Sequence, residues 1–265
     1  MPEPNRSSLR IIQITDCHLF ASKQAQLVGL TTQVSFDAVL SQIKQDKIEA
    51  DLILVTGDLS QDGSDAAYQR CFKALAEFAV PQIWIPGNHD QRAPMERLAA
   101  SAMVSVKQFA HWQIVALDSH IEGKVPGYLG AKELSILKAS LKQHPEKFTL
   151  VTCHHPPIKI GSAWLDSQRL KNGDELLKIM TSHTKETVLL WGHIHQQWDE
   201  QRDHLRLLAT PSTCFQFLPK SADYCLDTLA PGYRYLELHA DGRVDTHVRR
   251  LDHFQFTPDY SVKGY

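Results

Sequence analysis

Five short segments of this sequence combine carboxylate, amide and imidazole side chains, and each follows a hydrophobic run. They are Asp16-Cys17-His18, Gly57-Asp58, Gly87-Asn88-His89-Asp90, His154-His155 and Gly192-His193-Ile194-His195. Mixed oxygen and nitrogen donors of this kind are typical ligands of Mn, Fe or Zn, whereas a structural zinc ribbon or an iron–sulfur centre requires clustered thiolates. Because the segments offer more donors than one ion uses, they predict a two-metal site.

The composition is that of an ordinary globular α/β protein. The chain has 265 residues and a formal net charge of −2 at pH 7. Since no linker, repeat or low-complexity tract interrupts it, we expect a single domain over residues 1–265. A charge so close to zero gives no global attraction for nucleic acid or an anionic membrane, so neither is an expected partner.

Three features of the sequence bear on location. No apolar run approaches the ~20 residues that span a bilayer. Residues 1–8 lack the apolar core of a secretory signal. The 5 cysteines are scattered and form no C-x-x-C pair, which favours a reducing compartment. The sequence therefore predicts a cytoplasmic protein.

Hydrophobic runs and helical periodicity alternate in the first part of the chain. The expected strands are residues 9–15, 52–56 and 82–85, and the expected helices lie around residues 36–43 and 68–78. This order predicts parallel strands with right-handed crossovers. Ligands of open α/β sheets gather beyond the carboxyl ends of the strands, so Asp16, Asp58 and Asn88 are expected to lie together.

The alternation continues toward the remaining histidines. Further strands are expected at residues 104–109, 113–117, 148–152 and 187–191, and further helices near residues 131–143 and 174–183. The strands at 148–152 and 187–191 lead to His154 and His193. From residue 205 onward the chain is expected to be rich in strands. Two packed mixed β-sheets flanked by helices accommodate all these elements.

The five segments together resemble the calcineurin-like metallophosphoesterase superfamily, whose pattern is D-x-H, G-D, G-N-H-D/E, H and G-H-x-H in this order. Residues 208–217 and 230–234 resemble one subgroup, the bacterial class III 3′,5′-cyclic AMP phosphodiesterases. The resemblance covers about residues 10–265. It implies a four-layer αββα sandwich and hydrolysis of cyclic AMP to 5′-AMP by in-line attack of a metal-bridging hydroxide. It also implies two divalent ions, with Fe²⁺ or Mn²⁺ favoured over Zn²⁺ or Co²⁺.

The family pattern also implies a role for each ligand. One ion is expected to bind Asp16, His18, Asp58 and His195, and the other Asp58, Asn88, His154 and His193. Asp58 is suited to bridge both ions because a carboxylate has two oxygens with free lone pairs. The expected substrate contacts are His18, Asp58, Asn88, His89 and His195.

Two residues beside Asn88 are expected to serve catalysis. The resemblance implies that His89 faces the substrate, where it stabilises a phosphoryl oxygen or protonates the leaving alkoxide. Asp90 is expected to hold that imidazole in orientation. The alternative for Asp90 is that it caps a helix beginning before Pro94.

Several neighbouring residues have open roles. In the family pattern the first histidine of a His-His-Pro run is the ligand, which favours His154 over His155; His155 either orients it, contacts a phosphate or is structural. Cys17 and Cys153 are expected to be small buried residues. Trp164 either stacks on the purine or serves packing or a dimer contact. Residues 210–217 are expected at the rim of the site, where they would meet the nucleoside.

Two rivals to cyclic AMP hydrolysis stay open. Another phosphoesterase acting on nucleotides or generic phosphodiesters would use the same ligands. A non-catalytic scaffold is disfavoured because such proteins commonly lose ligands or the catalytic histidine, all of which are present here. The expected partner is the cyclic nucleotide, and the chain is expected to be a monomer or a homodimer.

Overall fold

A computed structural model describes residues 8–264 of the chain. Within this range the main strands form two sheets, both with parallel and antiparallel neighbours. In spatial order the first contains β15 (Val244–Arg250), β14 (Gly232–His239), β1 (Ser8–Ile14), β4 (Leu52–Thr56) and β5 (Gln82–Ile85). The second contains β10 (Trp198–Arg202), β11 (Leu205–Ala209), β9 (Thr187–Trp191), β8 (Phe148–Thr152), β7 (Trp112–Ala116) and β6 (Val106–Gln108). The expected pair of mixed sheets is confirmed.

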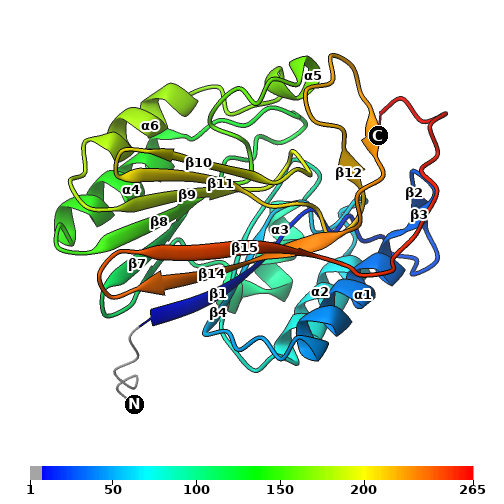
Figure 1. Cartoon of the computed structure of the whole chain (residues 1–265), viewed down its shortest axis with the longest axis horizontal. Coiled ribbons are helices and arrows are strands. Elements are labelled where there is room, and N and C mark those ends of the chain that lie inside the picture. The colour runs from blue at the N-terminus through cyan, green and yellow to red at the C-terminus, as the bar shows by residue number, and fades with distance from the viewer. Residues whose placement is uncertain (1–7, 265) are drawn as a thin grey trace.

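The two sheets face each other, and helices cover their outer faces (Figure 1). The helices are α1 (Thr32–Gln45), α2 (Asp65–Ala76), α3 (Arg92–Leu98), α4 (Ala131–Gln143), α5 (Ala163–Asp166) and α6 (Gly173–Thr181). In the picture α1 and α2 lie outside the first sheet, and α4 and α6 outside the second. Short pairs, β2 (Gln26–Leu27) with β3 (Leu30–Thr31) and β12 (Gln216–Phe217) with β13 (Leu226–Asp227), lie beside these layers. This is the expected αββα sandwich.

Strand side chains explain the layers because successive residues point to opposite faces. Ile11 and Leu54 belong to an apolar cluster that also contains Ile114 and Leu190 of the second sheet. Their neighbours Ile12 and Val55 belong instead to the cluster with α1 and α2. Strands buried on both faces have no polar alternation, which is why they appear as continuous hydrophobic runs in the sequence.

Most expected elements are confirmed, some to the residue. The structure has strands at Leu52–Thr56, Gln82–Ile85, Phe148–Thr152 and Thr187–Trp191 and a helix at Ala131–Gln143. Sequence patterns missed β10, whose residues are mostly polar and which lies at a sheet edge. They also missed α3, which has Pro94 near its start, where proline is tolerated. No helix among residues 8–264 has the length and apolarity required to cross a membrane.

Candidate dinuclear metal site

The predicted ligands follow the carboxyl ends of parallel strands from both sheets. Asp16, Asp58 and Asn88 come after β1, β4 and β5 of the first sheet, and His154 and His193 after β8 and β9 of the second. The two sheets therefore each contribute one side of the site. The expected convergence at one edge of the sandwich is confirmed.

Five of the seven predicted ligands have a left-handed backbone conformation. The φ angles are 54° at Asp16, 46° at His18, 52° at Asp58, 65° at His193 and 49° at His195. Non-glycine residues seldom adopt this region, and each instance costs on the order of 1–3 kcal/mol. Such backbone strain is concentrated at functional sites, where the surrounding structure holds it in place.

Glycines permit the ligand loops to touch. A Cβ atom on Gly57, whose φ is 100°, would lie 2.3 Å from His154 Nδ1. A Cβ atom on Gly87 would lie 2.2 Å from Asp58 Oδ1. Both glycines are therefore required for the approach of loops that follow different strands.

The ligand atoms form two groups that share Asp58. In the first group, His195 Nε2 lies 3.4 Å from Asp16 Oδ1 and 3.2 Å from His18 Nε2. In the second group, His193 Nδ1 lies 2.9 Å from Asn88 Oδ1. Asp58 Oδ2 is 4.0 Å from His18 Nε2 and 3.2 Å from His154 Nε2. Asp16 Oδ1 also lies 4.0 Å from His154 Nε2, so these atoms form one continuous cluster, and the division into two ligand sets that the resemblance implies stays a prediction.

Three of the imidazoles are oriented by a hydrogen bond at Nδ1. His154 Nδ1 donates to the carbonyl oxygen of Thr56 at 2.7 Å, and His195 Nδ1 to that of Phe215 at 2.8 Å. His18 Nδ1 lies 2.7 Å from Gln61 Oε1. A hydrogen bond at one ring nitrogen selects the tautomer whose other nitrogen has a free lone pair, as metal-ligating histidines require.

No sequence pattern marks these supporting contacts, since two of the acceptors are backbone carbonyls and Gln61 belongs to no motif. Thr15, whose hydroxyl donates to Asp16 Oδ2 at 2.7 Å, was not predicted either. The sequence signal that could have identified Thr15 is its position immediately before the predicted ligand Asp16. His120, half-buried after β7, was missed as well; burial lowers its pKa, and Asp58 and His154 act on it through their charges.

The residues present fit a pair of divalent cations. The Nε2 atom of His193 is buried and makes no hydrogen bond within the described residues, whereas the buried Nε2 atom of His154 faces the Asp58 carboxylate at 3.2 Å. Buried nitrogens without a partner are costly unless something else binds them. With two carboxylates and an amide oxygen beside them, these nitrogens form an N/O donor set suited to such ions. Together with the fold, this set implies a dinuclear divalent metal centre.

Burial and nearby charges act in opposite directions on the pKa values of Asp58 and His154. Burial acts to raise the pKa of Asp58, but His154, His89 and His18 outweigh it and hold that pKa well below the usual value. The pKa of His18 falls to about 3, mainly because of burial. Burial also acts to lower the pKa of His154, yet the Asp58 carboxylate raises it to about 9. The Asp58 carboxylate is therefore ionised and able to bind cations at neutral pH.

His89 lies beside His18 and Asp58. Its side chain is half-buried, and its ring packs edge-on against His18 at a centroid distance of 5.1 Å. Its backbone N–H donates to Asp58 Oδ1 at 2.9 Å. A ring nitrogen of His89 also groups with His18 and Asp58 within 4.8 Å. Its assignment to the substrate instead of an ion stays a prediction.

Asp90 is a buried anchor between two ligand loops. Its carboxylate accepts hydrogen bonds from the backbone N–H groups of Leu59 and Ser60, both at 3.0 Å, and of Gly87 at 2.9 Å. The hydroxyl of Tyr68 donates to it at 3.1 Å. The alternative of a helix cap is wrong, because Gln91 is the N-cap of α3. Orientation of His89 by Asp90 stays a prediction.

His155 lies beside the predicted ligands, with a ring nitrogen within 4.8 Å of ligand atoms of His154 and His193, but both of its ring nitrogens have other partners. Nε2 lies 2.9 Å from the carbonyl oxygen of Val125 and so donates to it. Nδ1 then accepts from the hydroxyl of Ser119 at 2.8 Å. These contacts attach the loop after β7 to the His154 segment and support the choice of His154 as the ligand. Cys17 and Cys153 are fully buried, as expected.

The rim position expected for residues 210–217 is wrong. Every residue in this stretch is buried. The Ser212 hydroxyl donates to the carbonyl oxygen of Asp16 at 2.7 Å, and the ring of Phe217 stacks on His195 at 4.5 Å. The stretch therefore contacts the ligand residues Asp16 and His195 from the buried interior. Trp164 is half-buried and packs edge-on against Phe217 at 4.7 Å, so its nucleotide contact stays a prediction.

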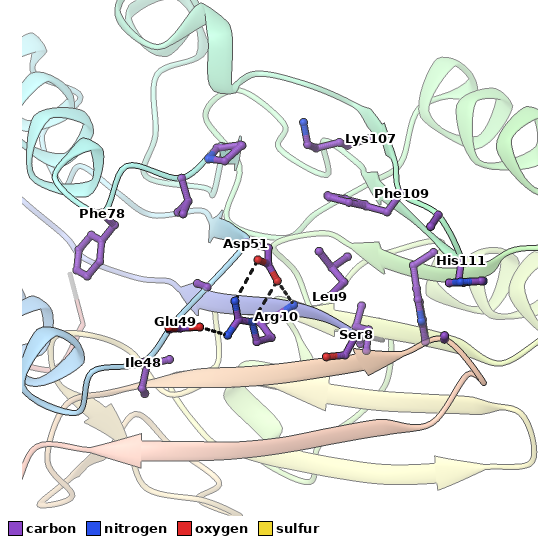
Figure 2. Close-up of a pocket in the computed structure, with 17 residues that line it drawn as sticks. Ser8, Leu9, Arg10, Ile48, Glu49, Asp51, Phe78, Lys107, Phe109 and His111 are labelled. Atoms are coloured by element: carbon purple, nitrogen blue, oxygen red, sulfur yellow. Dashed lines mark hydrogen bonds and ion pairs between the residues drawn. The ribbon is translucent and has the colours of Figure 1, made fainter. Parts of the chain in front are cut away.

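A cavity of about 860 Å³ lies elsewhere, where β1 and β7 begin (Figure 2). The ligand segment of Asp16 and His18 follows the opposite end of β1. Its walls include Leu9 and Trp112, and Arg10 is paired there with Asp51 at 3.3 Å. None of the predicted ligands lines it. This cavity is therefore separate from the candidate metal site.

Comparison with known proteins identifies the class. A sequence model of the family described as "Calcineurin-like phosphoesterase" matches residues 9–197. The chain belongs to this family. Over 261 residues it is 44% identical to the 3′,5′-cyclic adenosine monophosphate phosphodiesterase CpdA of Pseudomonas aeruginosa, covering 98% of this chain and 96% of that protein. It is also 44% identical to the protein of the same name from Escherichia coli K12, covering 100% of this chain and 98% of that protein.

Solved structures support the fold. A dimetal phosphatase from Danio rerio has a TM-score of 0.63 at 15% sequence identity, covering 92% of this chain and 99% of that chain. A purple acid phosphatase from yellow lupin has a TM-score of 0.69 at 12% identity, covering 97% of this chain and 54% of that chain. At such low identity the likeness concerns the arrangement of the elements.

Proposed function

We propose that this protein hydrolyses 3′,5′-cyclic AMP to 5′-AMP at a dinuclear metal centre. The observation that carries the proposal is the convergence of all seven predicted ligands in a chain that is 44% identical, over nearly its whole length, to proteins named for this activity. A metal-dependent phosphodiesterase requires such a site, and the chain retains every member of it.

Seven residues would hold the ions. Asp16, His18 and His195 would bind one ion and Asn88, His154 and His193 the other, while Asp58, which lies between the two groups, would bind both. We propose that the two ions are Fe²⁺ or Mn²⁺, with Zn²⁺ or Co²⁺ as alternatives suited to the same donors. When bound, two such ions supply Lewis-acid polarisation of the phosphoryl group and activation of water.

The chain's own residues orient the substrate and move a proton. His89, which is half-buried beside His18, would stabilise a phosphoryl oxygen or donate a proton to the ribose 3′ oxygen as that oxygen leaves phosphorus. The phosphate is expected to contact His89 together with His18, Asp58, Asn88 and His195. The hydrogen bonds at Nδ1 of His18 and His195 fix these rings before the substrate arrives.

Recognition of the nucleoside must come from residues outside the metal ligands, because the ligands treat any phosphoryl centre alike. Residues 210–217 are buried and do not form that surface. His120 and Trp164 are half-buried and come from segments that follow β7 and β8. They are the side chains that we propose to test for contact with the ribose or the base.

The decisive experiment compares substrates on one metal-restored preparation. Protein stripped by a chelator is reloaded with Mn²⁺, Fe²⁺, Zn²⁺ or Co²⁺, and kcat/KM is measured for cyclic AMP, cyclic GMP, bis(p-nitrophenyl) phosphate and 5′-AMP. We expect cyclic AMP to be opened to 5′-AMP and 5′-AMP to persist. If cyclic AMP is the poorest substrate, the protein is another metallophosphoesterase. Full activity in metal-free protein would overturn the mechanism.

The cellular location and the assembly state stay predictions from the sequence. We propose a cytoplasmic protein that is a monomer or a homodimer and needs no nucleic acid or membrane as a partner. Light scattering of the purified protein tests the assembly state, and fractionation of cells tests the location.

A further inference from the structure

The metal ligands are divided between two sheets, so the relative position of the sheets sets the distance between the ligand groups. Between the sheets lies an apolar cluster that includes Ile11, Leu54 and Leu190. Apolar contacts are non-directional and tolerate small shifts of one layer against the other. A precise ligand spacing therefore calls for directional bonds that cross this interior.

Arg234 is the centre of such bonds. It lies on β14 and is only 1% exposed. Its guanidinium donates to Thr210 Oγ1 at 3.1 Å, to Thr246 Oγ1 at 3.0 Å, and to the carbonyl oxygens of Ala209 at 2.7 Å and Trp198 at 3.1 Å. β14 belongs to the first sheet, whereas Ala209 and Trp198 belong to the second. The side chain thus joins the two sheets.

These four acceptors, all within the described residues, are neutral oxygens. Burial lowers the pKa of Arg234 to about 10, so the guanidinium is still charged at neutral pH. A buried cation is costly unless hydrogen bonds satisfy it. The fixed fork of an arginine satisfies several oxygens in one geometry, and a change in the position of either sheet would break that match.

Gln13 extends the bonds of Arg234 to the ligand loops. The hydroxyl of Thr210 donates to Gln13 Oε1. Gln13 Nε2 donates to Thr56 Oγ1 at 2.8 Å and to the carbonyl oxygen of Trp191 at 3.2 Å. Thr56 immediately precedes Gly57-Asp58, and Trp191 precedes Gly192-His193. Gln13 itself is fully buried on β1, three residues before Asp16.

We propose that Arg234, Thr210 and Gln13 are positioning residues that hold the ligand loops of the two sheets at the spacing needed for a two-ion site. None of the three binds an ion or substrate. They act through Thr56 and Trp191, the last residues of β4 and β9. The inference rests on the dinuclear centre of the proposed function, but it does not depend on which phosphodiester is the substrate.

A pair of matched variants tests this inference. Thr210→Val removes the side-chain link from Arg234 to Gln13 and leaves their backbone pairing in β14 and β1, whereas Thr246→Val removes another hydroxyl bound by Arg234 that does not lead to Gln13. Both are loaded with Mn²⁺. Elemental analysis gives the ions per chain, and electron paramagnetic resonance gives the fraction of Mn²⁺ ions that are magnetically coupled to a neighbour.

We expect Thr210→Val to show a larger uncoupled fraction and a loss of ~10-fold in affinity for the more weakly held ion, as for other contacts that orient metal ligands. Its kcat should fall with little change in KM. Thr246→Val should keep wild-type coupling and affinity. If the two variants have the same coupling and affinity, or if Thr210→Val lowers only the thermal stability of the metal-free protein, the inference is overturned.

If Thr210→Val does not fold, a second variant provides the test. Arg234→Lys keeps the buried cation but not the planar fork, so it cannot satisfy Thr210 and the Ala209 carbonyl together. It should also raise the uncoupled fraction of Mn²⁺, and wild-type coupling in a folded Arg234→Lys protein would contradict the inference. Neither measurement uses a nucleotide. A protein that binds two coupled ions yet fails to hydrolyse cyclic AMP would refute the proposed function and leave this inference standing.

Discussion

The imidazole of His154 donates a hydrogen bond of 2.7 Å from Nδ1 to the carbonyl oxygen of Thr56. This bond joins His154, which comes after β8 of the second sheet, to Thr56, the last residue of β4 in the first sheet. The bond leaves Nε2 of His154 directed toward Asp58, at 3.2 Å from its Oδ2 atom. It fixes both the tautomer and the placement of a predicted ligand.

His154 and His155 should therefore differ in their effect on metal content. His154→Ala removes a ligand, so elemental analysis should show the loss of about one ion per chain. His155→Ala removes contacts to Ser119 and Val125, so both ions should stay while the loop after β7 loosens. Metal loss confined to His155→Ala would reverse the assignment.

Replacement of Asp58 should be the most severe change of a single ligand. Its carboxylate lies between the two groups, 4.0 Å from His18 Nε2 and 3.2 Å from His154 Nε2. Asp58→Ala should therefore weaken both ions and abolish turnover, whereas Asn88→Ala should weaken one. Metal content is measured by elemental analysis after dialysis against buffer. A full complement of ions in Asp58→Ala would show that the bridging assignment is wrong.

Loss of His89 should separate chemistry from metal binding. If this half-buried imidazole acts on the substrate, His89→Ala should keep both ions and lose about 10²–10⁴-fold in kcat, the range for a general acid. Steady-state kinetics and elemental analysis on the same sample check this. His111→Ala, which removes an exposed imidazole beside the separate cavity, is the control for a general effect of removing an imidazole. Stripped metal in His89→Ala would make His89 a ligand.

Asp90→Asn should distinguish an anchor from an orienting partner of His89. The variant keeps one acceptor oxygen and places its NH₂ group either against the N–H of Gly87 or against those of Leu59 and Ser60, which leaves a buried donor unsatisfied at a cost of about 1–3 kcal/mol. We expect lower stability by urea denaturation and weaker metal binding, and a smaller effect from Tyr68→Phe. Wild-type stability and metal content with a lowered kcat would instead support orientation of His89.

The salt bridge of Asp46 should contribute to stability in a pH-dependent manner. Asp46 follows α1 and accepts hydrogen bonds from Arg249 on β15, with Nε at 3.1 Å, and from the hydroxyl of Tyr233 at 3.0 Å. The Arg249 bond holds the pKa of Asp46 below its usual value of 3.8, although burial opposes this. The ionised form is thus favoured in the folded state. Its contribution is complete well above pH 3.8 and is lost as the pH falls below it.

Asp46→Asn should therefore lower the free energy of unfolding by about 0.5–1 kcal/mol at pH 7, a modest value because the Arg249 side chain is 40% exposed and solvent screens the pair. The difference from wild type should shrink as the pH falls toward 3. Urea denaturation of metal-free protein at several pH values measures this. Asp223→Asn, at an exposed position, is the control. A difference that grows in acid would contradict the assignment.

The sequence by itself determined the ligand types, their order and the strands that carry them. Asp16, Asp58 and His193 each follow a run that is apolar because the strand is buried on both faces, and this local pattern is legible without a structure. Parallel strands end at one edge of a sheet, so the convergence of Asp16, Asp58 and Asn88 also followed from the order of elements.

Only the tertiary structure decided which residues contact and orient the ligands. The acceptors for His154 and His195 are carbonyl oxygens of Thr56 and Phe215, and any residue type supplies a carbonyl, so no sequence pattern marks them. Residues 210–217 were predicted at the rim, yet packing of the second sheet against the first buries them under Asp16. Arg234 and Gln13, 221 positions apart, are paired residues of β14 and β1, and Thr210 can link their side chains because it follows β11 of the second sheet, which faces the first. Spacing along the chain specifies the chemistry of this site, and contact between the layers specifies its geometry.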